Sequence, residues 1–237
     1  MAFFDEVLKE IADAGQPSGE VWFRGQADAS WPLVPRLLQS KLPPEQEKNM
    51  LARFRLRAMA MLSEHPPDND PARWLFLMQH HGLPTRLLDW SESALVALFF
   101  AIATEPETDG RLFILVPMAL NESQIGQRVL IAPTMSPCSD ILWASFKASQ
   151  HPGNIVAVAP YVSHDRLARQ RGGFTVHGIT TDLQQVAPKG VLRSIQIPAA
   201  GKRDLKKQLA HLGVTRTSLF HDLDGLASEL REEYGLS

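Results

Sequence analysis

The sequence predicts an α+β fold built on a mostly antiparallel sheet, and three observations lead to this prediction. Helical and strand-like patterns follow one another irregularly, without the regular strand-helix alternation that a doubly wound parallel sheet requires. The chain has 237 residues, of which 44% are hydrophobic, so it can bury one large core. No internal repeat or low-complexity linker divides it. We therefore expect residues 1–237 to form a single domain.

The first half of the chain contains helices and strands separated by short breaks. Asp70 and Pro71 are suited to cap and begin a helix, and Ser91 or Ser93 can cap a strongly apolar helix that should be central. Apolar residues at helical spacing also predict an N-terminal helix that stops at Gly15. In order, we expect a helix over residues 1–15, a strand over 20–23, helices over 45–64 and 70–82, a strand-like run over 83–90 and a helix over 94–103.

The second half begins with residues 111–117, which form the clearest strand pattern in the chain. Residues 165–171 read as a short helical turn that carries three arginines into a Gly-Gly break. We expect a short helix over 141–148, strands over 155–160, 173–177 and 191–198, and helices over 202–212 and 226–233. Residues 201–237 should form a C-terminal helical pair within the same domain.

Charge and composition exclude several classes of protein. The formal net charge of −2 argues against a protein whose main role is to coat nucleic acid or an anionic membrane. The single cysteine, Cys138, excludes an intramolecular disulfide and a multi-cysteine zinc site, which fits a reducing cytosol. The longest apolar run is too short to span a bilayer, and the N-terminus lacks the basic region of a secretory signal. We expect a cytoplasmic, bacterial-type soluble domain without a membrane partner.

Common catalytic motifs are absent from the sequence. Neither a P-loop nor a dinucleotide-binding glycine fingerprint occurs, which argues against an ATPase or a Rossmann enzyme. His80 and His81 are adjacent, so on a helix they diverge, and HExxH is absent; we expect no metal site. Ser91 and Ser93 lack the nucleophile elbow of a serine hydrolase.

Polar side chains in apolar surroundings mark the candidate site. His80, Arg86 and Asp89 lie in one of the most apolar stretches of the chain, and burying such groups is unfavourable unless each has a partner. Arg24 ends an apolar strand and is followed by Gly25, where a backbone or ligand can approach closely. Two interpretations stay open: Arg24 clamps an anion or amide, or it pairs with a buried carboxylate, for which Asp89 is a candidate.

Several ordered motifs together resemble the FRG domain family, named for its Phe/Tyr-Arg-Gly motif. The similarity covers nearly the whole chain, but the family name implies no particular reaction. The motifs are Phe23-Arg24-Gly25-Gln26, the loop with Trp31 and Pro35, Gln79-His80-x-Gly82-Leu83-Pro84-Thr85-Arg86-Leu87-Leu88-Asp89-Trp90, Ala97-Leu98-x-Phe100-Ala101, Gln170-x-Gly172-x-Phe174 and Leu219-Phe220-x-Asp222-Leu223-Asp224-Gly225.

A weaker resemblance to arginine-type ADP-ribosyltransferases implies a split sheet and a mechanism. Arg24-Gly25 is similar to the Arg-Gly that ends an early strand in that family, and Ser91 stands where its Ser-Thr-Ser element would precede a helix. The resemblance implies that Arg24 and Gly25 hold the phosphates and nicotinamide amide of NAD, while Ser91 orients the ribose. The third element, residues 170–176, lacks the Glu that stabilises the oxocarbenium-like transition state. Three explanations stay open. Gln170 could take a weaker orienting role, Asp89 could supply the negative charge from the other side of the pocket, or the site could bind a nucleotide without turnover.

The leading hypothesis is therefore an NAD-using ADP-ribosyltransferase or NAD glycohydrolase, with NAD as substrate and a protein or nucleic-acid acceptor. The competing hypothesis is a non-catalytic module that binds a nucleotide, nucleic acid or protein, with Arg24, Arg86 and Asp89 in a buried ion network. A nuclease using His80 as acid or base is a third, and a toxin or defence role would suit the first. The residues expected to line one pocket are Arg24, Gln26, His80, Thr85, Arg86, Asp89 and Gln170.

Overall fold

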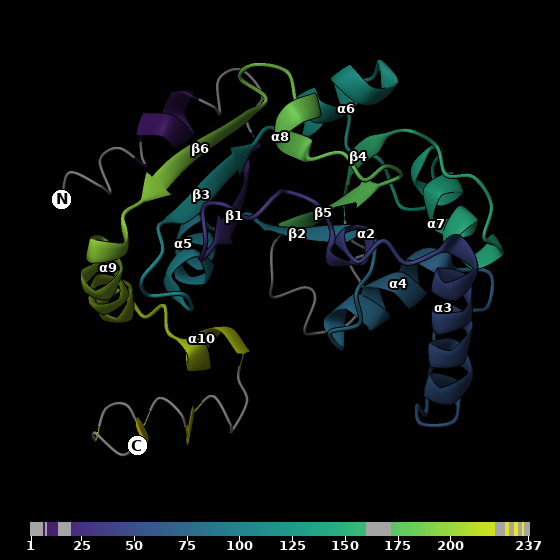
Figure 1. The fold of residues 1–237 in the computed structure, drawn as a ribbon, viewed down its shortest axis with the longest axis horizontal. Helices are drawn as coiled ribbons and strands as arrows, with labels where there is room; N and C mark the ends of the chain where they lie inside the picture. Colours follow the sequence, from purple (N-terminus) through teal and green to yellow (C-terminus); the bar gives the residue numbers. More distant parts are fainter. Residues whose placement is uncertain are drawn as a thin grey trace.

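The computed structural model in Figure 1 describes residues 7, 9–13, 20–159, 172–220, 226–227, 230–231 and 234. These contain a six-stranded sheet of order β4-β5-β2-β1-β3-β6, in which every neighbouring pair of strands is antiparallel. The predicted α+β class is therefore confirmed. The strands are β1 (Trp22–Gln26), β2 (Leu87–Ser91), β3 (Gly110–Leu115), β4 (Ile155–Val158), β5 (Gly172–His177) and β6 (Leu192–Ile197).

The helices begin where the sequence supplies capping groups. The Asp70 carboxylate accepts a hydrogen bond from the Arg73 backbone N–H at 3.0 Å, and the Ser93 hydroxyl accepts one from Val96 at 3.4 Å, so both predicted caps are confirmed. The helices are α2 (Arg36–Gln39), α3 (Pro44–Met59), α4 (Pro71–His80), α5 (Ala94–Ile102), α6 (Pro117–Ile125), α7 (Cys138–Lys147), α8 (Leu183–Val186), α9 (Ala199–His211) and α10 (Arg216–Phe220).

Side chains alternate between the two faces of the sheet, and different elements cover each face. Phe23, Leu112 and Ile114 pack in one cluster with α5 and α9, while Leu87 and Val176 pack with α3, α4 and α7. The opposite face forms a third cluster, covered by the loop before α2, by α6 and by α8. Its members include Trp22, Leu33, Leu88, Trp90, Phe113, Leu120 and Leu183. Neighbouring residues of one strand therefore belong to different cores.

The sheet divides between β1 and β2. Strands β1 and β3 pair along their whole length, from Trp22↔Leu115 to Gln26↔Arg111, whereas β1 and β2 pair only at Phe23↔Ser91. Figure 1 shows β3, β1 and β6 as one group and β2, β5 and β4 as another. All six strands belong to one hydrogen-bonded sheet, so the split implied by the resemblance to ADP-ribosyltransferases stays a prediction.

Most elements lie where the sequence predicted them, with shifted ends. The helix expected over 45–64 ends at Met59, because the carbonyls of Arg57 and Ala58 accept the backbone bonds of a closing turn. Helix α6 was not predicted, since Pro117 was assigned to the preceding strand although it begins the helix. Residues 9–13 are helical as expected, while the turn over 165–171 and half of 226–233 lie outside the described residues. Within the described ranges no helix is long and apolar enough to cross a membrane.

Candidate functional site

Three of the motifs from the sequence meet on adjacent strands. Phe23 of β1 pairs with Ser91 of β2, and Ser91 pairs in turn with Gly172 of β5, so the three residues form one row across the sheet. Arg24 follows this row on β1, and Asp89 lies two residues before it on β2. The register thus brings the Arg-Gly motif, the Asp-Trp-Ser motif and the start of β5 to one place, which is the end of β2 beside the division of the sheet.

The Asp89 carboxylate is exposed and is oriented by a chain of hydrogen bonds from α4. The Leu87 N–H donates to the Thr85 hydroxyl at 3.3 Å, and this hydroxyl donates to Gln79 Oε1. The Gln79 amide nitrogen then donates to Asp89 Oδ2 at 2.8 Å. Because each donor in this chain is fixed by the next group, Asp89 is a positioned carboxylate on an open surface.

The side chain of Arg24 binds the backbone of β2. Its Nη1 donates to the carbonyl oxygen of Asp89 at 2.6 Å, across the part of the β1 and β2 interface that has no ladder pairing. Its Nε is buried without a hydrogen-bond partner among the described residues. Burial lowers the pKa of the guanidinium, the Asp89 charge raises it, and Arg36 lowers it further. Arg24 therefore senses the Asp89 charge without an ion pair between the two side chains.

Gly25 and Ser91 each have a structural contact. A Cβ at Gly25 would overlap the carbonyl of Ala97 and come within 2.6 Å of the Ala101 nitrogen, so this glycine faces the backbone of α5. Of the two approaches that the sequence allowed at Gly25, by a backbone or by a ligand, the structure shows the backbone of α5. The Ser91 hydroxyl accepts a bond from the Ser93 N–H at 3.0 Å, which shapes the turn into α5.

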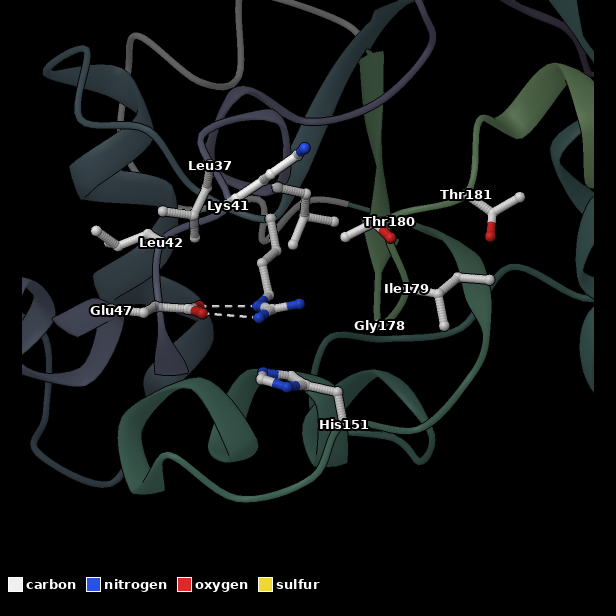
Figure 2. Close-up of a pocket in the computed structure, with 11 residues that line it drawn as sticks. Leu37, Lys41, Leu42, Glu47, His151, Gly178, Ile179, Thr180 and Thr181 are labelled. Carbon is white, nitrogen blue, oxygen red and sulfur yellow. Dashed lines mark hydrogen bonds and ion pairs between the residues drawn. The ribbon is translucent and has the colours of Figure 1, made fainter. Parts of the chain in front are cut away.

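Arg86 does not pair with Asp89, so the predicted ion network of Arg24, Arg86 and Asp89 is wrong. Arg86 Nε and Nη2 donate to the two carboxylate oxygens of Glu47, at 2.8 and 2.7 Å, and Figure 2 draws both bonds as dashed lines at Glu47. This pair joins β2 to α3 and is buried, with side-chain exposures of 8% for Arg86 and 1% for Glu47. The reason is alternation, because residues three apart on an extended chain point to opposite faces.

His177 is a buried polar residue that no sequence pattern singled out. Its Nε2 contacts the Thr175 hydroxyl at 3.0 Å, which also accepts a bond from Trp90 Nε1 at 3.1 Å, while its Nδ1 has no partner in the described part of the chain. Burial, with the positive charges of Arg24 and Arg86, lowers the pKa of His177 to about 3. The imidazole is therefore neutral at pH 7 and is packed inside the core.

The remaining predicted residues are dispersed. The amide nitrogen of Gln26 donates to the Pro32 carbonyl at 3.3 Å, on the sheet face opposite Asp89. His80 is exposed at the end of α4, with its ring edge toward His81. Gln170 lies outside the described residues. The structure thus brings Arg24, Asp89 and Ser91 together, adds Thr85 through Gln79, and places Arg86 at a different cavity.

Sequence reasoning missed two residues that orient the predicted ones. Gln79 holds Asp89, and Glu47 holds Arg86. Gln79 was part of the FRG motif, so it could have been chosen as a residue of the site. Glu47 carried no signal, because a glutamate near the start of a charged helix usually faces solvent.

No metal site appears in the described ranges, which contain no group of three or more His, Cys, Asp or Glu residues that could hold an ion. Cys138 is buried, and burial raises the pKa of its thiol to about 12, so the thiolate is not available at neutral pH.

These features define an α+β domain with a partly split antiparallel sheet and an oriented carboxylate at the division. Residues 19–110 match the family model of the FRG domain, a stretch that ends at the start of β3 and contains Arg24, Gln79 and Asp89. This part of the chain therefore matches the family that its motifs predicted, while the motifs over 170–174 and 219–225 lie outside the matched residues. Searches of the curated proteins and of the solved structures return no significant match.

Proposed function

We propose that this FRG domain binds NAD where β1, β2 and β5 meet and cleaves it, transferring ADP-ribose to water or to a protein or nucleic-acid acceptor. The observation that carries the proposal is the exposed Asp89 carboxylate, which Gln79 and Thr85 hold in place two residues from Ser91, while Arg24 binds the Asp89 backbone carbonyl. Cleavage of a glycosidic bond passes through a positively charged sugar, and a fixed carboxylate stabilises that charge.

The roles of the residues follow from the groups they leave available. Arg24 Nη1 is bound to β2, whereas its Nη2 has no partner among the described residues and is the group we assign to a phosphate of NAD. Asp89 faces the developing positive charge on the ribose. The bond between ribose C1′ and the nicotinamide nitrogen breaks, nicotinamide leaves with the bonding electrons, and an acceptor oxygen attacks C1′ and loses its proton. We assign that proton to His80, which follows Gln79 at the exposed end of α4.

A second candidate is a module that binds a nucleotide or partner without turnover. It is favoured by β5, which carries no carboxylate from Gly172 to His177, and by the structural contacts of Gly25 and Ser91. In this case Asp89 would be a binding residue that accepts hydrogen bonds from ribose hydroxyls.

The experiment measures NAD binding by calorimetry and nicotinamide release by chromatography in the same samples. We expect the wild type to bind NAD and release nicotinamide, and Asp89→Asn to keep binding but lose about 10²-fold in release rate, the usual cost of one group that stabilises transition-state charge. Glu92→Gln is the matched control, since Glu92 is exposed, lies three residues after Asp89 and carries the same charge.

The outcomes separate the two candidates. If Arg24→Ala weakens NAD binding and the wild type releases no nicotinamide, the function is that of the binding module. If the wild type neither binds NAD nor releases nicotinamide, the proposal is wrong. Equal release rates for Asp89→Asn and Glu92→Gln would remove Asp89 from the mechanism.

A further inference from the structure

A polar cavity lies at the opposite end of β2 from the proposed NAD site. Its volume is about 440 Å³, within the range of small-molecule sites. It forms where β2 begins and β5 ends, beside the start of α3 (Figure 2). Arg86 and Ser91 are five residues apart on an extended chain, so this cavity lies about 17 Å along the strand from Ser91. Lining residues are Leu37, Leu38, Lys41, Leu42, Glu47, Arg86, His151, Gly178, Ile179, Thr180 and Thr181.

Arg86 presents a fixed, unused edge of its guanidinium to this cavity. Glu47 takes Nε and Nη2 in a bidentate pair, which fixes the plane of the group, and Nη1 has no hydrogen-bond partner among the described residues. The residue as a whole is only 7% exposed. A buried ion pair costs desolvation energy, and a pair whose only role is structural is often replaceable by apolar side chains. The N–H groups of Arg86 Nη1, held in a fixed orientation toward a cavity, are suited to bind an anion.

Other groups around the cavity complement an anion with an apolar body. Lys41 lines the rim, makes no ion pair with a described residue, and has a φ of 54°, a left-handed conformation that is uncommon for lysine. Thr180 and Thr181 add hydroxyl groups. The aliphatic part of the lining, called the aliphatic wall below, comes from Leu37, Leu38, Leu42 and Ile179. In Figure 2, Leu37 and Leu42 lie on the side of Glu47 and Ile179 lies on the other side.

His151 completes the polar side of the cavity. In Figure 2 its ring points toward the bonds at Glu47. Its Nε2 contacts the Ser145 hydroxyl at 3.1 Å, which leaves Nδ1 without a partner among the described residues. Burial and the charge of Arg86 lower the pKa of His151, against the opposing charge of Glu47, so the ring is neutral at pH 7. The cavity then holds the charges of Arg86, Lys41 and Glu47, with one positive charge in excess.

We propose that this cavity binds a phosphate monoester, with the phosphate on Arg86 Nη1 and Lys41 and the ester group against the aliphatic wall. A phosphate suits the site because arginine and lysine can share its oxygens while threonine hydroxyls and His151 bind the rest. This inference does not rest on the proposed NAD chemistry, because none of its residues contacts Asp89 or Arg24 in the bonds described above.

The test uses the full chain and phenyl phosphate as probe, with inorganic phosphate and benzoate beside it, at constant ionic strength in chloride. We expect saturable binding of phenyl phosphate by calorimetry, stronger than that of inorganic phosphate because the aliphatic wall contributes, and stronger than that of benzoate. Lys41→Gln should weaken binding about tenfold, the value of one charge-assisted hydrogen bond. Lys48→Gln is the matched control, because it removes the same charge from a partly exposed lysine of α3 that does not line the cavity.

A second variant keeps the test independent of folding. Glu47→Leu with Arg86→Met replaces the buried pair by apolar side chains of similar size, and we expect it to fold and lose phenyl phosphate binding. Equal affinities of Lys41→Gln and Lys48→Gln, binding that survives in the folded double variant, or benzoate binding as tight as phenyl phosphate would each overturn the proposal. Unchanged phenyl phosphate affinity in Asp89→Asn would separate this site from the proposed NAD site.

Discussion

The buried pair of Glu47 and Arg86 allows a quantitative prediction about stability. Glu47→Gln keeps the size of the side chain but removes its charge, so Arg86 remains buried with an uncompensated positive charge. The pair is nearly inaccessible, with side-chain exposures of 1% and 8%, and both carboxylate oxygens are bonded at 2.8 and 2.7 Å. Breaking such a pair costs about 3–5 kcal/mol. We expect a value near the lower limit, since the Gln oxygen still accepts one bond.

Thermal unfolding converts this free energy into a shift that is easy to measure. For a chain of 150–250 residues, 1 kcal/mol lowers Tm by about 2–4 °C, so Glu47→Gln should lower Tm by about 6–12 °C. Circular dichroism in buffer without phosphate is the assay, because an anion bound at Arg86 would offset the loss.

Two variants make this result specific. Glu45→Gln, on the same helix, removes an exposed carboxylate 3.5 Å from Lys48. It should change Tm by no more than about 2 °C, since an exposed pair three residues apart on a helix contributes about 0.2–0.5 kcal/mol. The double variant Glu47→Leu with Arg86→Met should recover most of the stability lost in Glu47→Gln. If Glu47→Gln melts within about 2 °C of the wild type, the pair is not buried as described and the reasoning fails.

Two further predictions concern the packing of the sheet. Gly25→Ala should destabilise the fold by about 2–3 kcal/mol, because the new Cβ meets the backbone of α5. Gly201→Ala in α9 should stabilise the fold by about 0.5–1 kcal/mol, because no atom lies within 4 Å of the new Cβ. Urea unfolding measures both changes, and equal effects would contradict the packing described for Gly25. The pKa of His177 is about 3 in the folded state and 6.5 in the unfolded state, so the unfolded state binds the proton first as the pH is lowered. The free energy of unfolding therefore falls by up to about 1.4 kcal/mol for each pH unit that the pH drops from 6.5 to 3. The wild type should therefore lose more stability than His177→Asn when the pH is lowered from 7 to 5. A stability difference between the two that is independent of pH would show that His177 does not titrate as described.

The sequence predicted the elements well because their signals are local. The caps at Asp70 and Ser93, the apolar strand that became β3 and the apolar helix that became α5 each depend on residues a few positions apart. The order of the strands depends on contacts between distant segments, such as Ser91 with Gly172, and local patterns do not specify these. The same limit applies to the site, where Gln79 and Glu47 act on residues 10 and 39 positions away.

One error in the predicted site was avoidable from the sequence, because strand alternation already opposed it. Residues 83–90 were expected to be strand-like, and on a strand Arg86 points to the opposite face from Asp89. The structure follows this rule, since Leu88 and Trp90 belong to one core and Leu87 to another. A single segment therefore carries residues of both proposed sites, with Asp89 oriented from α4 at one end of β2 and Arg86 oriented from α3 at the other. Because each side chain has its own anchoring residue, substitution at Gln79 should affect NAD chemistry alone, and substitution at Glu47 should affect phosphate binding and stability.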